Sequence, residues 1–407
     1  MPKTTARFNI LLILLSLALA ACAPSGPPAA PTLDAAELAT IVAATLSAEP
    51  PPANATPSAT PSPEVEGILP TAVYFLSDRG GSMQVWRLAS DGETLRQLTE
   101  AEDGVDSLDV AADGQVAYVS GNQLWLRGVD GDNKLLVDGS AADPDSESFH
   151  YTQRISAPRF APEGKRLAYA LNGVHLLDLD SGEDQQLLIN QLNGNDNDFV
   201  FPEELYSPEA WSPDGSRLLV SIAYVEGGSL GVLQPGGAQG LVRFDAEGVI
   251  CCQVAWAADS ARVLVASPYA GIVTSGLWAY DAVSGAESAL LDASDPDGGL
   301  HFAGWPQATS EDLYYFYASS AGVQEGDVPL FMVRNQLGDL GDQEQLRPES
   351  FSIREALWAP DGSLALILEN PILVAEGVTG GTILLVRADG GPAQPLADQA
   401  HDMRWGP

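Results

Sequence analysis

From Thr71 onward the chain alternates short apolar runs with turn-forming residues, and no 12-residue amphipathic helical pattern interrupts them. The apolar runs occupy residues 116–119, 167–171, 218–223, 263–266, 313–317 and 364–368. Runs of this length bounded by Gly, Pro and Asp are typical of β-strands. They are continuous rather than alternating, as expected when both faces of a sheet are covered. The pattern therefore predicts an all-β fold in which each sheet packs between two neighbours.

A repeated anchor organises these strands. A large or apolar residue followed by a Pro-Asp-Gly-like turn recurs every 45 to 53 residues, at Val110, Phe160, Trp211, Trp256, Trp305, Trp358 and Trp405. Pro presets φ, Asp hydrogen-bonds its own backbone, and Gly takes the left-handed conformation. Each turn separates a first strand (A) from a second (B), and further apolar segments supply strands C and D. The large anchor side chains are expected to fill the wedge between neighbouring sheets.

The two ends of this region complement each other. Residues 72–77, 84–88 and 95–98 match strands B, C and D without an A strand before them, whereas residues 401–407 match an A strand with nothing after it. Joined, the two fragments make one complete sheet, and pairing them removes exposed sheet edges. The prediction is a seven-bladed β-propeller over residues 71–407, with four-stranded antiparallel blades and a ring closed by its N- and C-terminal strands.

Two segments carry a family resemblance. Residues 74–81 (YFLSDRGG) and 211–219 (WSPDGSRLL) resemble the PD40 (WD40-like) repeats of TolB-type propellers, which also occur in the propeller domains of prolyl-oligopeptidase-like peptidases. The resemblance covers about residues 71–407 and implies a propeller fold, with a binding or scaffold role as in TolB-like domains. The repeats are longer than the usual ~40 residues. Trp305 lacks a following Asp-Gly turn, and residues 249–253 leave little room for a D strand in the fourth unit.

The N-terminal region reads as an export signal and a tether. Residues 1–21 resemble a signal peptide, because the uncharged, mostly apolar run 8–19 is shorter than the roughly 20 residues that span a bilayer. The motif LAAC, ending at Cys22, resembles the bacterial lipobox, which implies lipidation of Cys22 and anchoring to the bilayer. Residues 22–70 form a tether rich in Pro, Ala, Ser and Thr, with a possible short helix over 34–46.

Charge narrows the range of partners. The chain has 19 basic and 55 acidic residues, a net charge of −36, and removing Lys3 and Arg7 with the signal leaves −38. Nucleic acid and anionic lipid head groups need basic surfaces, so neither is expected as a partner. Protein, peptide, glycan or cation ligands stay open, as does a role of the acidity in solubility alone.

The adjacent residues Cys251 and Cys252 are interpreted as small apolar residues of a buried strand, because no other candidate ligand stands at metal-ligand spacing from them.

The extra length of the repeats falls on one face. The predicted insertions are the B–C connections 226–239, 267–276, 319–328 and 370–381, and the D–A connections 139–153 and 190–206. In an up-and-down blade these two kinds of connection emerge together, on what we name the loop face, whereas the A–B and C–D turns form the turn face. Functional loops commonly decorate a rigid scaffold, although long loops are also tolerated without function. We expect the binding site on the loop face and at the mouth of the channel.

Two of these connections mix carboxylates with aromatic side chains. The candidate binding residues are Asp143, Asp145, Phe149, Tyr151, Asp196, Asp198, Phe199 and Phe201. Asn195, Asp196 and Asp198 also make a weak Ca²⁺ candidate, since oxygen ligands suit that ion. Glu204 fits the twelfth position of an EF-hand loop, but Asp198 stands where the sixth-position glycine is needed. No other cofactor or metal is expected.

Catalytic motifs are weak. The G-x-S-x-G string at 227–231 falls in a predicted B–C loop rather than a strand-to-helix turn, so we interpret it as coincidental. His150, His175, His301 and His401 lack metal-ligand spacing, and His175 and His401 are expected to be structural.

The sequence therefore predicts a non-catalytic, membrane-anchored propeller that acts as a binding or scaffold module outside the cytoplasm. One alternative is a metal-assisted hydrolase or lactonase-type enzyme, which should have converging polar groups at the channel mouth. A second is a surface polysaccharide-binding protein, which should have an aromatic row beside carboxylates. A scaffold should instead expose an apolar patch on the loop face.

Overall fold

The computed structural model describes residues 67–193, 201–225, 227–237, 239–244, 253–268, 275–291, 299–320, 329–337, 339–369 and 380–407. Residues 65–407 form one compact unit. The predictions for the signal peptide, Cys22, residues 23–66 of the tether, Cys251 and Cys252, Asn195, Asp196, Asp198 and Phe199 lie outside the described residues, whereas Leu69, at the end of the predicted tether, is buried in the core. Within them, no helix has the length and apolarity needed to cross a bilayer.

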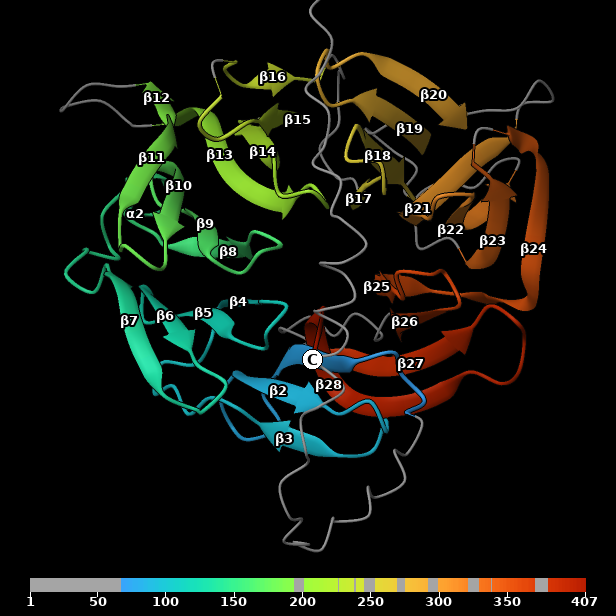
Figure 1. Cartoon of the computed structure of the whole chain (residues 1–407), viewed down its shortest axis with the longest axis horizontal. Helices are drawn as coiled ribbons and strands as arrows, with labels where there is room; N and C mark the ends of the chain where they lie inside the picture. The colour runs from blue at the N-terminus through green and yellow to red at the C-terminus, as the bar shows by residue number, and fades with distance from the viewer. Residues whose placement is uncertain are drawn as a thin grey trace, which may run out of the picture. The chain divides into compact units, whose positions relative to one another are not determined.

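The described unit is a ring of seven antiparallel blades, as predicted (Figure 1). Blade one joins β28 (Gln394–Gly406) to β1 (Ala72–Ser77), β2 (Gln84–Leu88) and β3 (Leu95–Gln97). Blade two is β4 (Ser107–Val110), β5 (Val116–Ser120), β6 (Gln123–Arg127) and β7 (Asn133–Asp138). Blade three is β8 (Ser156–Phe160), β9 (Arg166–Ala170), β10 (Gly173–Asp178) and β11 (Asp184–Ile189). The short helix α2 (Phe149–Thr152) lies between blades two and three in the chain.

The other four blades follow the same order from the centre outward. Blade four is β13 (Phe201–Trp211), β14 (Leu218–Tyr224), β15 (Gly227–Leu233) and β16 (Val242–Arg243), with β12 (Gln191–Asn193) added beside β13. Blade five is β17 (Gln253–Trp256), β18 (Arg262–Ser267), β19 (Gly276–Asp281) and β20 (Glu287–Leu291). Blade six is β21 (Leu300–Ala308), β22 (Asp312–Ser320), β23 (Leu330–Gln336) and β24 (Asp339–Phe351). Blade seven is β25 (Ile353–Trp358), β26 (Leu364–Glu369), β27 (Gly381–Arg387) and the first half of β28.

The ring closes through β28, which confirms the predicted pairing of the two ends. Its second half pairs with β1, placing Trp405 opposite Val73 and Arg404 opposite Tyr74. Its first half pairs with β27, so one strand is both the outermost strand of blade seven and the innermost strand of blade one. Asp402, with φ of 55°, lies at the irregularity within this pairing. Val73 and Met403 belong to the same buried core cluster, so the closure also buries apolar surface.

The anchor tryptophans join neighbouring blades. Each is largely buried, as expected for a side chain that fills the wedge between sheets. In addition, the indole N–H of four of the five anchor tryptophans donates to a main-chain oxygen on the inner strand of the preceding blade, which explains why tryptophan suits these four positions better than phenylalanine. The bonds run from Trp211 to Arg159 (3.0 Å), from Trp256 to Ala210 (3.1 Å), from Trp358 to Trp305 (2.7 Å) and from Trp405 to Trp358 (2.7 Å).

The fourth blade differs from its prediction. Residues 227–233 form strand β15 instead of the predicted B–C loop, and the two-residue β16 supplies strand D ahead of the position expected. Glycine is needed here because a Cβ on Gly231 would lie 2.8 Å from the Leu241 side chain and 3.0 Å from the Val242 oxygen. The close approach of the two strands at Gly231 is one that glycine tolerates, so a segment that resembles a loop in sequence pairs here as a strand.

The sixth unit replaces its missing Asp-Gly turn with another device. Strand β21 continues through Trp305, which has φ of 48°, as far as Ala308. The N–H of Thr309 then donates to the oxygen of Asp312 at 2.9 Å and closes the A–B turn. The blade therefore keeps its four strands without the usual turn sequence.

Candidate functional site

The structure places the described candidate binding residues on the loop face. Asp143 and Asp145 are exposed in the connection between β7 and β8, and a carboxylate oxygen of Asp143 accepts the N–H of Asp145 at 3.0 Å. Phe149 and Tyr151 lie half-buried in α2. Phe201 is exposed at the start of β13. The carboxylate of Asp143 thus stabilises its own turn, while the aromatic residues hold or border the loop.

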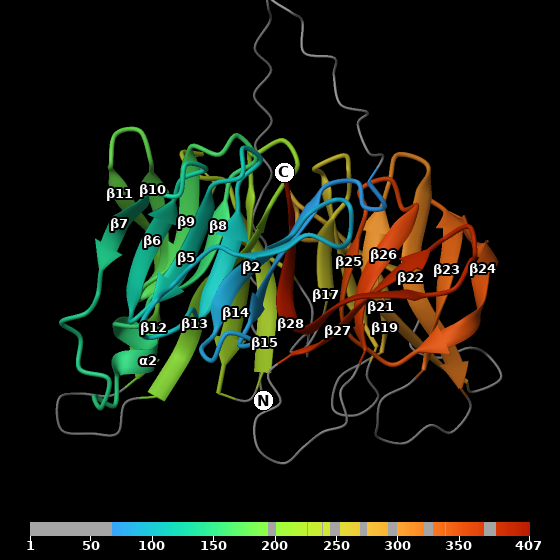
Figure 2. The same cartoon turned by 90° about the horizontal axis from the view of Figure 1, so that it is seen from below.

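Asn190 brings the two predicted loops together. Its Nδ2 donates to the main-chain oxygen of Tyr151 at 2.7 Å, and its Oδ1 accepts the N–H of Tyr206 at 2.8 Å. Strand β12 begins directly after Asn190, and its residue Asn193 pairs with Phe201 of β13, so the bridge is followed by a short antiparallel pair of strands. Figure 2 shows α2 beside β12 and β13 at the same end of the blades. Asn190 was not predicted, because the sequence around it offers only one signal, a polar amide that follows directly after a D strand.

Exposed apolar side chains concentrate near this bridge. Seven large apolar side chains are exposed in the described residues, and four of them lie at the loop-face ends of blades three and four. These four define what we name the apolar loop patch: Ile189 (53% exposed), Phe201 (38%), Tyr224 (38%) and Val225 (62%). Ile189 ends β11, Phe201 begins β13 and Tyr224 ends β14. Single exposed apolar residues are ordinary, but a local concentration of them is typical of interaction surfaces.

Glu204 is engaged beside this patch. It accepts hydrogen bonds from Arg243 Nη1 at 2.8 Å and Nη2 at 2.6 Å, and it also accepts the hydroxyl of Tyr206. The Arg243 hydrogen bonds are the main reason why the pKa of Glu204 lies below its ordinary value. Both carboxylate oxygens are thus used within blade four, although the position of Glu204 would suit the twelfth ligand of a calcium loop. No cluster of three metal-ligating side chains occurs in the described part of the chain.

Charged side chains on the inner strands pair with one another at the ring closure. The guanidinium of Arg404 lies 3.4 Å from Asp109 and 2.7 Å from Asp402, joining blade one to blade two. Glu355 on β25 accepts the N–H groups of Asp402 (2.8 Å) and Met403 (2.5 Å). Burial raises the pKa of both Asp109 and Glu355. This network was not predicted, because it assembles from strands about 50 to 300 positions apart.

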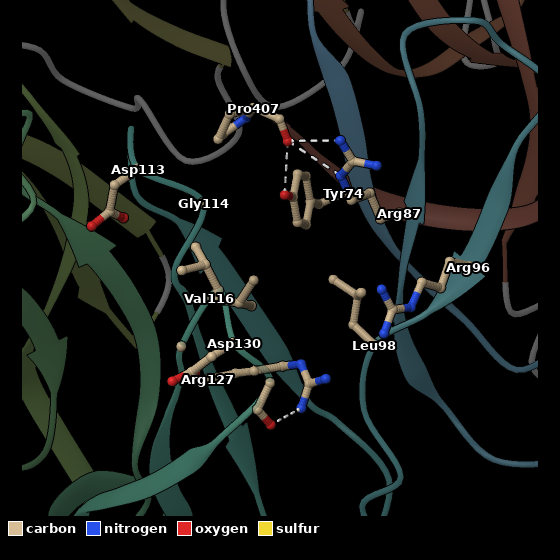
Figure 3. A pocket seen from close by; sticks show the side chains of 13 residues that line it. Tyr74, Arg87, Arg96, Leu98, Asp113, Gly114, Val116, Arg127, Asp130 and Pro407 are labelled. Atoms are coloured by element: carbon tan, nitrogen blue, oxygen red, sulfur yellow. Dashed lines mark hydrogen bonds between the residues drawn. The ribbon is translucent and has the colours of Figure 1, made fainter. Parts of the chain in front are cut away.

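A pocket of about 390 Å³ opens between blades one and two at the turn face (Figure 3). Its lining includes Tyr74, Arg87, Arg96, Arg127 and Pro407. Three of the chain's 19 basic residues therefore meet in one small hollow of a strongly acidic protein. This pocket was not predicted, because the binding site was expected on the opposite face of the ring.

Ser229, His175 and His401 occupy structural positions. Ser229 is buried inside β15, with its Oγ 3.4 Å from the main-chain oxygens of Leu230 and Phe244, so the G-x-S-x-G string is not at a strand-to-helix turn. His175 Nδ1 lies 3.2 Å from Asp184 on the neighbouring strand. Burial lowers the pKa of His401, which lies on the closing strand as predicted.

No protein-family model matches the chain, and no curated protein sequence matches it. Among solved structures, it is similar to TolB from Acinetobacter baumannii at 13% identity and a TM-score of 0.43, over 83% of this chain and 66%, just under two thirds, of that chain. It is similar to a putative TolB from Agrobacterium tumefaciens at 13% identity and a TM-score of 0.41, over 74% and 98% of the two chains. The β-propeller domain of the Trilobed protease from Pyrococcus furiosus gives 12% identity and a TM-score of 0.47, over 81% and 94%. The resemblance to TolB-type propellers concerns the fold alone.

Proposed function

We propose that the chain is an exported, lipid-anchored propeller that binds a protein partner through the apolar loop patch and catalyses no reaction. The observation that carries this proposal is the concentration of four exposed apolar side chains at the loop-face ends of adjacent blades. Burying such side chains against a partner gains about 25 cal/mol for each Å² removed from water. The closed ring and the Asn190 bridge hold these strand ends in place, which limits the entropy lost on binding.

A protein partner suits the patch better than a glycan does. Sugars stack on aromatic rings, and the patch offers Phe201 and Tyr224 for that purpose, but Ile189 and Val225 are aliphatic. The enzyme alternative requires polar groups that converge at the channel mouth and are free to act. On the inner strands, Asp109 and Arg404 pair with each other instead, which supports a binding role over hydrolysis.

The proposed location rests on the sequence. The 1–21 segment would direct export, Cys22 would carry the acyl chains, and residues 22–70 would separate the ring from the outer side of the bacterial membrane. Acyl chains contribute about 0.8 kcal/mol for each buried CH₂, so more than one chain gives stable anchoring. The net charge of −36 supports partners other than nucleic acid.

Site-specific crosslinking in cells tests the proposed surface. A photo-crosslinking residue in place of Val225 should trap a protein partner, because this side chain lies in the apolar loop patch. The matched control replaces Val283, which is 51% exposed but lies in the β19–β20 turn on the turn face. Val225→Asp should then abolish capture from a neighbouring patch position, and Val283→Asp should leave it intact. Equal crosslinking from both positions, or none from the patch, would contradict the proposal.

A further inference from the structure

The turn-face pocket has a wall of directly paired residues. In blade one, Tyr74 on β1 lies opposite Arg87 on β2, and Arg87 lies opposite Arg96 on β3. Directly opposite residues project from the same face of a sheet, so all three side chains face blade two. Arg127, at the end of β6, comes from that neighbouring blade. Figure 3 shows the arginine side chains extending toward the hollow from the two blades.

This arrangement is unfavourable unless something compensates the charge. Like charges directly opposite each other on adjacent strands destabilise a sheet, and Arg87 and Arg96 are such a pair. The chain contains 55 acidic residues that could neutralise them. Nevertheless, among the described residues no side-chain carboxylate lies within ion-pair distance of these three arginines, whereas Arg243 pairs with one carboxylate and Arg404 with two. Arg87 is engaged by the oxygen of Pro407, so the local positive charge that the pocket keeps is mainly that of Arg96 and Arg127.

The pocket already holds one oxygen and has donors left over. The main-chain oxygen of Pro407 accepts the Tyr74 hydroxyl at 3.0 Å and the Nε and Nη2 groups of Arg87 at 3.2 and 3.0 Å. Arg127 Nη1 donates to the Gly131 oxygen at 2.6 Å. In the part of the chain that the structure describes, the five N–H donors of Arg96 have no hydrogen-bond acceptor. A guanidinium presents those donors in a planar fork that matches oxyanions.

The two carboxylates in the lining are occupied by their own turns. Asp113 accepts the main-chain N–H of Gln115 at 3.0 Å and its side-chain amide at 2.6 Å. Asp130 accepts the N–H of Asp132 at 3.2 Å. In Figure 3 both carboxylates lie on the side of the hollow away from Arg87 and Arg96. The pocket thus combines a cationic wall with an acidic rim, which favours a compact anion over an extended one.

We propose that this pocket binds a phosphate group, held between Arg96 of blade one and Arg127 of blade two. A phosphate monoester carries about −1.5 to −2 charges near pH 7 and three acceptor oxygens, so it can use two guanidinium groups at once. A carboxylate brings one charge and two oxygens. The volume of about 390 Å³ accommodates the phosphate of a small molecule or of a lipid head group. This site is independent of the apolar loop patch, because it lies on the opposite face of the ring.

Calorimetric titration of the full chain with inorganic phosphate tests the site. We expect saturable binding that Arg96→Gln and Arg127→Gln each weaken roughly 10- to 100-fold, since a hydrogen bond to a charged group has that value. The matched control, Arg262→Gln, removes the same charge from an exposed pair with Asp259 and should bind like the parent. In phosphate-free buffer Arg96→Gln should melt no earlier than the parent chain, because it relieves a like-charge pair.

A second arm identifies the source of the phosphate. Vesicles containing phosphatidic acid are compared with vesicles of phosphatidylcholine alone, using the same variants. Arg96-dependent binding of inorganic phosphate supports a free ligand, whereas Arg96-dependent binding only to phosphatidic acid supports a lipid head group. The proposal is overturned if neither probe binds, if Arg96→Gln binds both as tightly as the parent, or if Arg262→Gln loses as much affinity as Arg96→Gln.

Discussion

Replacing Trp358 with phenylalanine tests the hydrogen bonds between blades. The indole N–H of Trp358 donates to the main-chain oxygen of Trp305 at 2.7 Å, and both side chains are buried. In Trp358→Phe the Trp305 oxygen loses this donor, at a cost of about 1–3 kcal/mol. The smaller ring also leaves a cavity, which adds roughly 1 kcal/mol. We therefore expect the free energy of unfolding to fall by about 2–4 kcal/mol.

Differential scanning calorimetry measures this loss as a change in melting temperature. Unfolding entropy near the transition is about 2.1 cal/mol/K for each residue. For a unit of about 340 residues this gives roughly 0.7 kcal/mol/K. The expected loss then corresponds to a melting temperature about 3–6 °C lower, provided that the ring unfolds as one transition.

Trp86→Phe is the matched control. The Trp86 indole nitrogen is buried, and it has no hydrogen-bond acceptor among the described residues. Its replacement therefore removes a similar volume but no hydrogen bond, and the melting temperature should fall by only about 1–2 °C. The reasoning is refuted if Trp358→Phe lowers the melting temperature no more than Trp86→Phe does.

Three further predictions concern the ring closure and the anchor. Burial raises the pKa of Glu355 above its ordinary value of 4.5, so the folded state holds this proton more tightly than the unfolded chain and the contribution of the group to stability falls as the pH rises. Glu355→Gln should accordingly gain stability relative to the parent as the pH rises above about 4.5, and a difference in melting temperature that does not change with pH would contradict this. Deleting residues 401–407 should expose the edge of β1 and abolish cooperative melting, with aggregates visible by size-exclusion chromatography; a monomer that melts cooperatively would contradict the closure. Cys22→Ser should remove labelling by radioactive palmitate and shift the protein from the membrane to the soluble fraction, whereas an unchanged distribution would argue against lipidation.

The ends of the strands were predicted well where turn-forming residues stand directly beside them in the sequence. The predicted strands 72–77 and 84–88 coincide with β1 and β2, because turn residues beside short apolar runs fix the ends of such strands. The ring closure could be predicted by counting, since one unit lacked an A strand and another segment supplied it. The fourth blade was mispredicted because Gly231 of strand β15 packs closely against the segment of β16, a contact that no local pattern reveals.

The sites depend on contacts that sequence reasoning cannot supply. Asn190 reaches Tyr151 across 39 positions, and only the packing of blades three and four makes it a bridge between two loops. Arg87 and Arg127 come together because blades one and two are neighbours. Exposure likewise cannot be judged from residue type alone, since Phe201 is exposed whereas Phe302 is fully buried. The sequence therefore predicted which face of the ring carries the long loops, but not which residues of that face contact one another.

The single strand β28 has a consequence for how the ring comes apart. Elsewhere in the described chain the D strand of one blade and the A strand of the next are separate elements, whereas Gln394–Gly406 is continuous from the perimeter to the centre. Fraying of this strand would remove an edge from blades one and seven simultaneously, so the two blades should open as one cooperative unit. Native-state hydrogen exchange should then give the amides of β1 and β27 a common opening free energy.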